Sequence, residues 1–249
     1  MPQSQPKPQE SPVSLTSPSA APKLRHYIAT FKERGNHIKS SRYLNALMGG
    51  DFEQADFVET QVHMRFAVAN FSRPMALLMS RLPDLSDRLP ILENVFDEHG
   101  RGKLGDGHDS TFRLLLERLG ASRAQVEKCR PWPEILAYNT SLAGTACFES
   151  VHFGMAVFGM IEDLFGEAAF VTGESIVKRG WLPKDRVVHY PLHATLDNEH
   201  AEGFYRYLDA PYESDPKAAL DIEQGLALGA HLIMTFFDDL YRARHRRAN

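Results

Sequence analysis

Cysteine is scarce in this sequence of 249 residues, with only Cys129 and Cys147 present. Two cysteines exclude both a disulfide framework and a cysteine-rich zinc site. Long apolar runs are also missing, because no uncharged stretch approaches the roughly 18 residues needed to cross a bilayer. An excess of positive charge is lacking too, since 28 Lys and Arg stand against 32 Asp and Glu. The net charge of −4 therefore predicts no binding to nucleic acid or to an anionic membrane.

The first 22 residues differ in composition from the rest of the chain. They contain six prolines, many Ser and Gln residues and no apolar core of the kind that a secretory signal needs. Such a segment buries too little apolar surface to offset its ordering entropy, so we predict a disordered tail over residues 1–22. Residues 23–249 show no second linker and no internal repeat. We expect them to form a single domain of a cytoplasmic protein.

The body of the chain has the apolar periodicity of helices and almost no alternating strand pattern. Four glycines between Gly100 and Gly107 interrupt this pattern, because glycine at that density breaks a helix. Gly120 then ends the following segment. The sequence predicts an all-α bundle. The helices that we expect cover residues 51–82, 86–99, about 108–119, 134–165, about 191–208 and 217–247.

The most informative motif is His193-Ala-Thr-Leu-Asp197-Asn-Glu-His200. On a helix, residues spaced by four and by seven project from one face, so these three side chains point in the same direction. Two imidazoles and a carboxylate on one face suit a divalent metal such as iron and leave coordination positions open. The alternative is a polar, solvated face on a histidine-rich helix.

Two further segments carry candidate ligands. Glu98 and His108 flank the glycine-rich connection, which is flexible enough to bring a carboxylate and an imidazole together. Glu162 ends a run of small and apolar residues, where a buried carboxylate needs a cation or hydrogen bonds. The alternatives are an ordinary charged turn for the first pair and a solvent-facing position beside Asp163 for Glu162. Helical bundles build dinuclear carboxylate sites from such groups.

With these motifs in this order, the sequence resembles the haem-oxygenase-like di-iron oxidases and oxygenases. The likeness spans roughly residues 40–242, and the family fold is a bundle of about seven helices around the metal site. Some members of the family use an additional glutamate from an earlier helix, for which Glu53 and Glu59 are the candidates. The resemblance implies that Glu98, His108 and His200 hold one iron, and that Glu162, His193 and Asp197 hold the other, with Glu162 as a bridge.

The resemblance also implies an activity. Two Fe(II) ions per chain would activate O2 to oxidise a small organic substrate, such as an amine, an amino acid or an aliphatic acid, in secondary metabolism. The protein's part in such a reaction is to hold open coordination positions beside a dry pocket. A homodimer is compatible with the family. The candidate pocket residues are Phe66, Met155, Phe158, Met160 and Tyr190, and the alternative for each of them, which we favour, is ordinary packing in the core.

Two alternatives to the di-iron enzyme remain open. Thiaminase-like hydrolases share the haem-oxygenase-like bundle without a cofactor, and they need a nucleophilic cysteine beside a carboxylate. Cys147, two residues before Glu149, is the candidate here, although its small neighbours favour a packed and inert thiol. The second alternative is a non-catalytic helical protein that binds a partner. Metal content distinguishes this protein from the di-iron enzyme.

Overall fold

The computed structural model describes residues 22–246, and within them the chain forms helices and short connections without a strand. The all-α fold predicted from the sequence is therefore confirmed. The α-helices of this part are α1 (Lys23–Glu33), α2 (Arg42–Gly49), α3 (Gln54–Ser80), α4 (Leu85–Glu98), α5 (His108–Arg118), α6 (Arg123–Lys128), α7 (Pro133–Phe148), α8 (Val151–Lys178), α9 (Tyr190–Ser214) and α10 (Pro216–Ala243).

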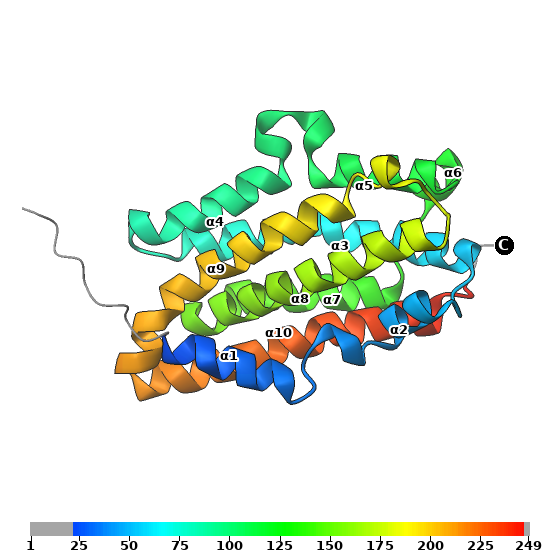
Figure 1. Ribbon diagram of the computed structural model, residues 1–249. Coiled ribbons are helices and arrows are strands. Elements are labelled where there is room, and N and C mark those ends of the chain that lie inside the picture. The colour runs from blue at the N-terminus through cyan, green and yellow to red at the C-terminus, as the bar shows by residue number, and fades with distance from the viewer. Residues whose placement is uncertain (1–21, 247–249) are drawn as a thin grey trace, which may run out of the picture.

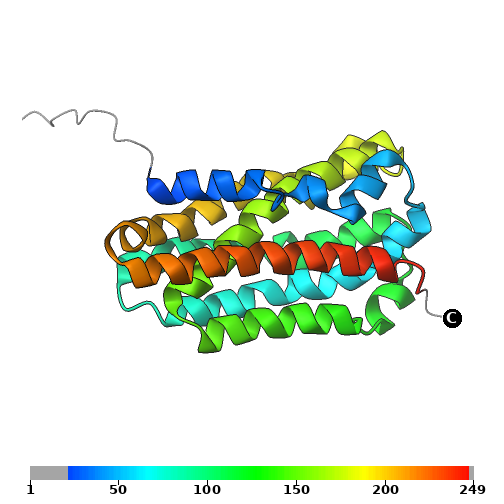
Figure 2. The ribbon, with the colours of Figure 1, turned by 90° about the horizontal axis from the view of Figure 1, so that it is seen from below.

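The long helices lie side by side and share one apolar core (Figure 1). Helix α8 is central, because it packs most extensively against α9 and α10. Helix α3 contacts α7, α4 and α5. Seen from below, α10 runs across the face of the bundle, with α1 and α2 on one side and α7 on the other (Figure 2). None of the helices in the described part is long and apolar enough to cross a membrane.

Several helix boundaries differ from the sequence prediction, and α8 continues to Lys178, past the predicted end at 165. The stretch predicted as one helix over 134–165 is two helices, because Glu149 is extended and the Ser150 side chain caps α8 by accepting a hydrogen bond from the Phe153 amide at 3.2 Å. Helix α9 continues to Ser214, past the predicted end near 208, and accommodates Pro211 in its last turn. Most of the predicted tail, residues 1–21, and Arg247 at the predicted end of the last helix lie outside the described residues.

The glycine-rich connection folds back tightly between α4 and α5. It forms two short 3₁₀ turns, Gly100–Gly102 and Leu104–Asp106, which rise above the two helices in Figure 1. Gly100 has a φ of +66°, and a side chain there would overlap the backbone at Gly107. This close approach brings the last residue of α4 next to the first residue of α5.

Glycines also set the distance between the central helices. A Cβ atom on Gly225 or Gly229 of α10 would lie 2.5 or 2.6 Å from a backbone oxygen of α8, so only glycine permits this approach. On the other side of α8, a Cβ on Gly166 would lie 3.1 Å from the Asp197 Cβ of α9. Small residues on α8 and α10 therefore allow three long helices to pack closely.

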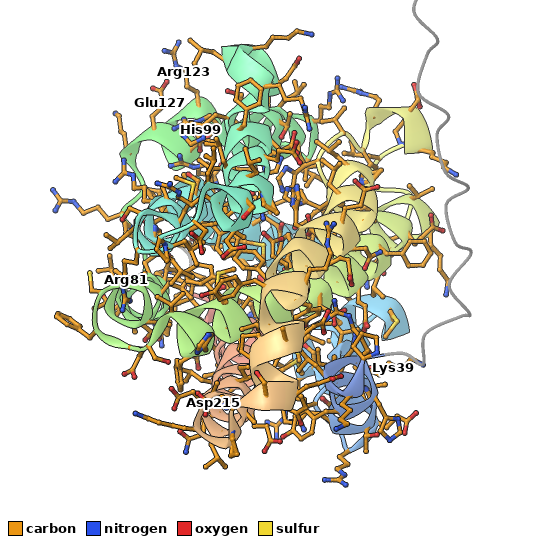
Figure 3. All side chains as sticks on the ribbon, turned by 90° about the vertical axis from the view of Figure 1, so that its left-hand side faces the viewer. Lys39, Arg81, His99, Arg123, Glu127 and Asp215 are labelled. Atoms are coloured by element: carbon orange, nitrogen blue, oxygen red, sulfur yellow. The ribbon has the colours of Figure 1, made fainter. Side chains whose placement is uncertain are left out.

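Polar groups at the periphery fix the helix ends. The Arg81 guanidinium at the end of α3 donates to the carbonyl oxygens of Ala146 and Glu149 at 2.8 and 2.7 Å, which satisfies free acceptors at the end of α7. Figure 3 shows Arg81 and Asp215 at the edge of the bundle. The Asp215 side chain accepts from the Lys217 amide at 2.9 Å and so caps the start of α10.

We expect Gly229→Ala to destabilise the protein by about 1–3 kcal/mol, because the added methyl must displace the α8 backbone at Val157. The matched control is Gly144→Ala in α7, where nothing lies within 4 Å of an added Cβ. That substitution should stabilise the protein by about 0.5–1 kcal/mol through helix propensity alone. Urea denaturation of both variants measures the two effects. Equal effects of the two substitutions would contradict the close packing of α8 and α10.

Candidate metal centre

Four helices bring the six predicted ligands together in the interior of the bundle. One candidate ligand is the last residue of α4, a second is the first residue of α5, and a third lies in the middle of α8. The other three candidate ligands lie on the face of α9 that is turned toward α8. All six side chains are buried. They are Glu98 of α4, His108 of α5, Glu162 of α8, and His193, Asp197 and His200 of α9.

Glu98 and His108 form the first contact, across the glycine-rich connection. His108 Nδ1 lies 2.9 Å from Glu98 Oε1. The ring of His108 lies edge-on to that of His193, with centroids 4.3 Å apart. His193 Nδ1 in turn lies 2.9 Å from Asp197 Oδ1. These contacts join three helices at one buried point, so the turn between α4 and α5 does more than connect two surface helices.

Glu162, Asp197 and His200 form the second group. One ligand atom of each lies within 4.8 Å of the other two, a separation that a single cation can span. His200 Nδ1 is 3.9 Å from both Glu162 Oε2 and Asp197 Oδ1. Glu162 points into the bundle, whereas its neighbour Asp163 contacts Lys32 at 2.7 Å nearer the surface. The geometry thus places His200 next to Glu162 and Asp197, and the division of the six ligands between two irons stays a prediction.

Further polar side chains orient these groups. Asn94 Nδ2 of α4 donates to Glu162 Oε1 at 2.7 Å. Asp97 Oδ2 lies 3.3 Å from His200 Nε2, and the Arg101 Nε atom lies 2.5 Å from the other Asp97 oxygen. Asp97 thus occupies the place of a carboxylate that fixes the tautomer and orientation of a histidine ligand, leaving Nδ1 of His200 directed at the candidate metal position.

His189 is a site residue that the sequence reasoning missed. It is fully buried at the start of α9, its ring lies 4.3 Å from that of His193, and its Nδ1 lies 3.0 Å from Thr111 Oγ1. The available signal was its spacing of four residues before His193, which places both rings on one helical face. Asn94 and Asp97 carried no comparable signal, because their partners lie on other helices.

Burial of the acidic groups raises their pKa values. Burial raises the pKa of Glu162 to about 8, and the nearby Asp197 carboxylate adds to the effect. The pKa of Asp197 lies well above its ordinary value for the same reason, with a further contribution from Glu98. In the absence of a cation, these two carboxyl groups therefore favour their protonated forms near neutral pH.

The remaining groups divide into a charged pair and a neutral ring. Burial by itself would raise the pKa of Glu98 and lower that of His108, but their mutual attraction shifts both pKa values the other way. Each partner of the pair therefore favours the charged form of the other. Burial and the positive charge of His108 lower the pKa of His193 to about 3, so its ring is neutral and offers a lone pair.

The donor set fits a divalent iron ion. Carboxylate oxygens and imidazole nitrogens suit iron, and no thiol is among the donors. The buried nitrogens His193 Nε2 and His200 Nδ1 have no hydrogen-bond partner within the described residues. Buried polar atoms normally find a partner, so an unpaired His200 Nδ1 at 3.9 Å from the Glu162 and Asp197 carboxyl groups is what a cation between these three side chains would require.

A cavity of about 50 Å³ adjoins this site. Glu98, Glu162 and His193 line one side of it. The other walls are apolar or aromatic, and they come from α3, α7, α8 and α10. The pocket candidates from the sequence do not line this cavity, and the last four of them are buried in the core, as the alternative of ordinary packing predicted: Phe66, Met155, Phe158, Met160 and Tyr190. The lining side chains are those of Met64, Ala67, Val68, Phe71, Tyr138, Ile161, Phe165, Ile233 and Phe236.

The other candidates from the sequence lie elsewhere. Glu53 is exposed just before α3, and Glu59 Oε1 contacts His63 Nε2 at 3.4 Å. Cys129 Sγ lies 3.4 Å from the same His63 nitrogen, at a separate surface cleft. Cys147 is exposed near the end of α7, so the expectation of a packed thiol was wrong. Neither cysteine lines the cavity beside Glu162.

Comparison with known proteins identifies a family and a fold. The family model described as "Iron-containing redox enzyme" matches residues 58–234. A domain of unknown function with a heme oxygenase-like fold from Shewanella denitrificans is 16% identical, with a TM-score of 0.68 over 88% of this chain and 91% of that one. A TenA homologue from Pseudomonas syringae is 15% identical, with a TM-score of 0.71 over 94% and 99%.

A third similar structure is a TenA homologue from Pyrococcus horikoshii, which is 14% identical, with a TM-score of 0.65 over 88% of this chain and 97% of that one. At these identities the structural matches show the fold alone. The fold is the haem-oxygenase-like bundle that the motifs implied. No curated protein matches the chain.

The raised pKa of Glu162 predicts a loss of stability with rising pH in the metal-free protein. The folded state holds a proton on Glu162 that the unfolded chain releases near pH 4.5, so stability falls as the pH rises from there to about 8. Between pH 6.5 and 8 this group should account for a loss of about 1–2 kcal/mol. Glu162→Gln, measured by urea denaturation in chelator, should remove that part of the loss.

The matched control is Glu174→Gln, which changes an exposed carboxylate on the same helix. It should leave the pH dependence as in the parent protein. An unchanged slope in Glu162→Gln would show that this carboxyl group is not the one that holds the proton.

Proposed function

This chain belongs to the iron-containing redox enzyme family, and on that premise we propose that it is a non-haem di-iron enzyme that uses O2 to oxidise a small organic substrate. Glu98, His108, Glu162, His193, Asp197 and His200 are the proposed ligands. Bound ferrous ions would supply electrons and open coordination positions for O2.

One observation carries the proposal. Two buried carboxyl groups with raised pKa values, Glu162 and Asp197, lie beside the buried nitrogens His193 Nε2 and His200 Nδ1, which have no partner in the described part of the chain. Such an arrangement is unfavourable without a cation, because it buries polar groups without compensating them. A divalent ion would replace the protons on the carboxyl groups and use the free lone pairs.

Neighbouring polar residues orient three of the proposed ligands, His193, His200 and Glu162. His193 Nδ1 lies 2.9 Å from Asp197 Oδ1, and a ring proton held between these two atoms would leave Nε2 free to bind. Asp97 Oδ2 lies 3.3 Å from His200 Nε2, where a ring proton would in the same way leave Nδ1 free. Asn94 holds Glu162 Oε1 and leaves Oε2 facing His200. These contacts favour binding of a metal on the inner side of α9.

The cavity indicates which part of a substrate would face the ligands. Its walls include Val68, Phe71, Phe165 and Ile233, and no Lys or Arg of the described residues lines it. An apolar portion of the substrate would therefore occupy the cavity, since a carboxylate would find no cation there. Apolar walls also exclude water from the site, which strengthens electrostatic interactions within it.

A hydrolase without a cofactor is the second candidate, because TenA homologues share the fold. Such an enzyme needs a nucleophile beside its substrate. The exposure of Cys147, and the fact that neither cysteine lines the cavity, favour the iron enzyme for this chain. A non-catalytic binding protein has no need for buried, unpaired imidazole nitrogens.

We expect the anaerobically purified protein to bind about two Fe(II) ions per chain, as di-iron carboxylate bundles do. His193→Ala and His200→Ala each remove a nitrogen directed into the site, so both should weaken Fe(II) binding at least tenfold and abolish O2 consumption with substrate. Calorimetric titration under argon and an oxygen electrode measure these effects. Circular dichroism checks that the helices remain intact.

The matched control is His231→Ala, which removes an exposed histidine of α10 and should leave both measurements unchanged. A folded parent protein that takes up no Fe(II) would refute the metal centre. Turnover that survives chelation but is lost in Cys147→Ser would identify the hydrolase instead.

A further inference from the structure

Helix α4 presents a row of four large apolar side chains to solvent, Leu85, Leu89, Leu92 and Phe96. The row is continuous along the helix, because its members are spaced by four, three and four residues. These residues belong to the outer face of a helix whose other face carries Asn94 and Glu98 of the candidate metal centre. The exposed fractions are 66% for Leu85, 50% for Leu89, 47% for Leu92 and 46% for Phe96.

Helix α4 has a buried inner face as well, so the exposed row is not what holds the helix to its own bundle. Ile91 and Asn94 are buried on the inner side, where α4 contacts α3 and α9, so the helix is already anchored to its own bundle. The outer row has the alternating four- and three-residue spacing of the seam between two paired helices. Contiguous apolar surface of this kind marks an interaction site.

The charges along α4 argue against a membrane as the partner. Asp84, Asp87, Glu93 and Asp97 lie on or next to the helix, against a single basic residue, Arg88. A helix that binds an anionic lipid surface carries Lys and Arg on its polar face. The apolar row is therefore bordered by charges that would repel such a surface, and a protein surface is the better match.

Arg88 and Glu93 border the row on opposite sides and are five residues apart. In a parallel pair of helices, Arg88 of one helix faces Glu93 of the other helix across the seam. The Arg88 guanidinium donates only to the backbone oxygens of Pro83 and Asp84, at 3.4 and 3.3 Å, and neither residue has an ion-pair partner in the described residues. A second α4 in parallel orientation would supply both partners, twice by symmetry.

We propose that the outer face of α4 is the interface of a homodimer in which the two α4 helices pack in parallel around a two-fold axis. The apolar row provides the buried seam, and Arg88 of each protomer faces Glu93 of the other. An antiparallel pair would instead place Arg88 opposite Val95 and Glu93 opposite Ser86, without any charge complementarity. The parallel orientation therefore distinguishes this dimer from a non-specific apolar contact.

Sedimentation velocity of the full chain over a range of concentrations tests the proposal. The parent protein should show a species of about twice 28.1 kDa. Leu89→Lys and Leu92→Lys, which place a charge in the seam, should each raise the dimer dissociation constant at least about tenfold. The matched control is Leu220→Lys, an equally conspicuous exposed leucine on α10, which should leave the dissociation constant unchanged.

Charge reversal tests the orientation. Arg88→Glu and Glu93→Arg should each raise the dissociation constant about fivefold, since each substitution creates two like-charged pairs. The double variant Arg88→Glu/Glu93→Arg should restore the parent value. A monomeric parent protein, or a dimer insensitive to Leu89→Lys and Leu92→Lys, would overturn the interface. Failure of the double variant to restore dimerisation would overturn the parallel arrangement.

Discussion

The dominant constraint on this bundle is the burial of three carboxylates and four imidazoles at one point between α4, α5, α8 and α9. Charges in a dry interior must be neutralised, and here the neutralisation is divided among different partners. Glu98 is balanced by His108, while Glu162 and Asp197 have raised pKa values. Protons thus occupy the place that a divalent cation would take, and this couples protonation of the site to metal binding.

Close helix packing creates this situation. Gly166 of α8 allows α9 to approach at Asp197, and Glu162 lies one turn earlier on the same face of α8. A side chain at position 166 would force the Asp197 Cβ to move by a few tenths of an ångström, because an added Cβ would lie only 3.1 Å from it. The cavity beside the site has the same origin, since the side chains that surround it are held by helices packed on several sides.

Helix α4 connects the site to the surface. Its inner face supplies Asn94 and Glu98, and Asp97 near its end holds His200. The turn that follows is tight enough to place His108 opposite Glu98, and Arg101 in that turn pairs with Asp97. The orientation of several site residues therefore depends on how firmly this one helix and its glycine-rich turn are held.

The sequence by itself determined the helical class, most helix positions and the six buried candidate ligands. These properties depend on periodicity and on short motifs, and residues such as His193, Asp197 and His200 share a face wherever their helix is placed. Local signals also existed for the capped start of α8 at Ser150 and for His189, four residues before His193. Both residues are visible in the chain, since Ser150 precedes the apolar run of α8 and His189 lies one helical turn before His193.

Only the tertiary structure decided how the ligands group, what orients them and where the cavity lies. The partners of Glu162 and His200 come from α4, which is distant in sequence, so Asn94 and Asp97 look like ordinary polar residues until the helices pack. The cavity-lining residues were missed because every large apolar side chain in a bundle has the same sequence signature. Which of them border empty space depends on the distances between helices, and those distances are set by contacts between segments far apart in the chain.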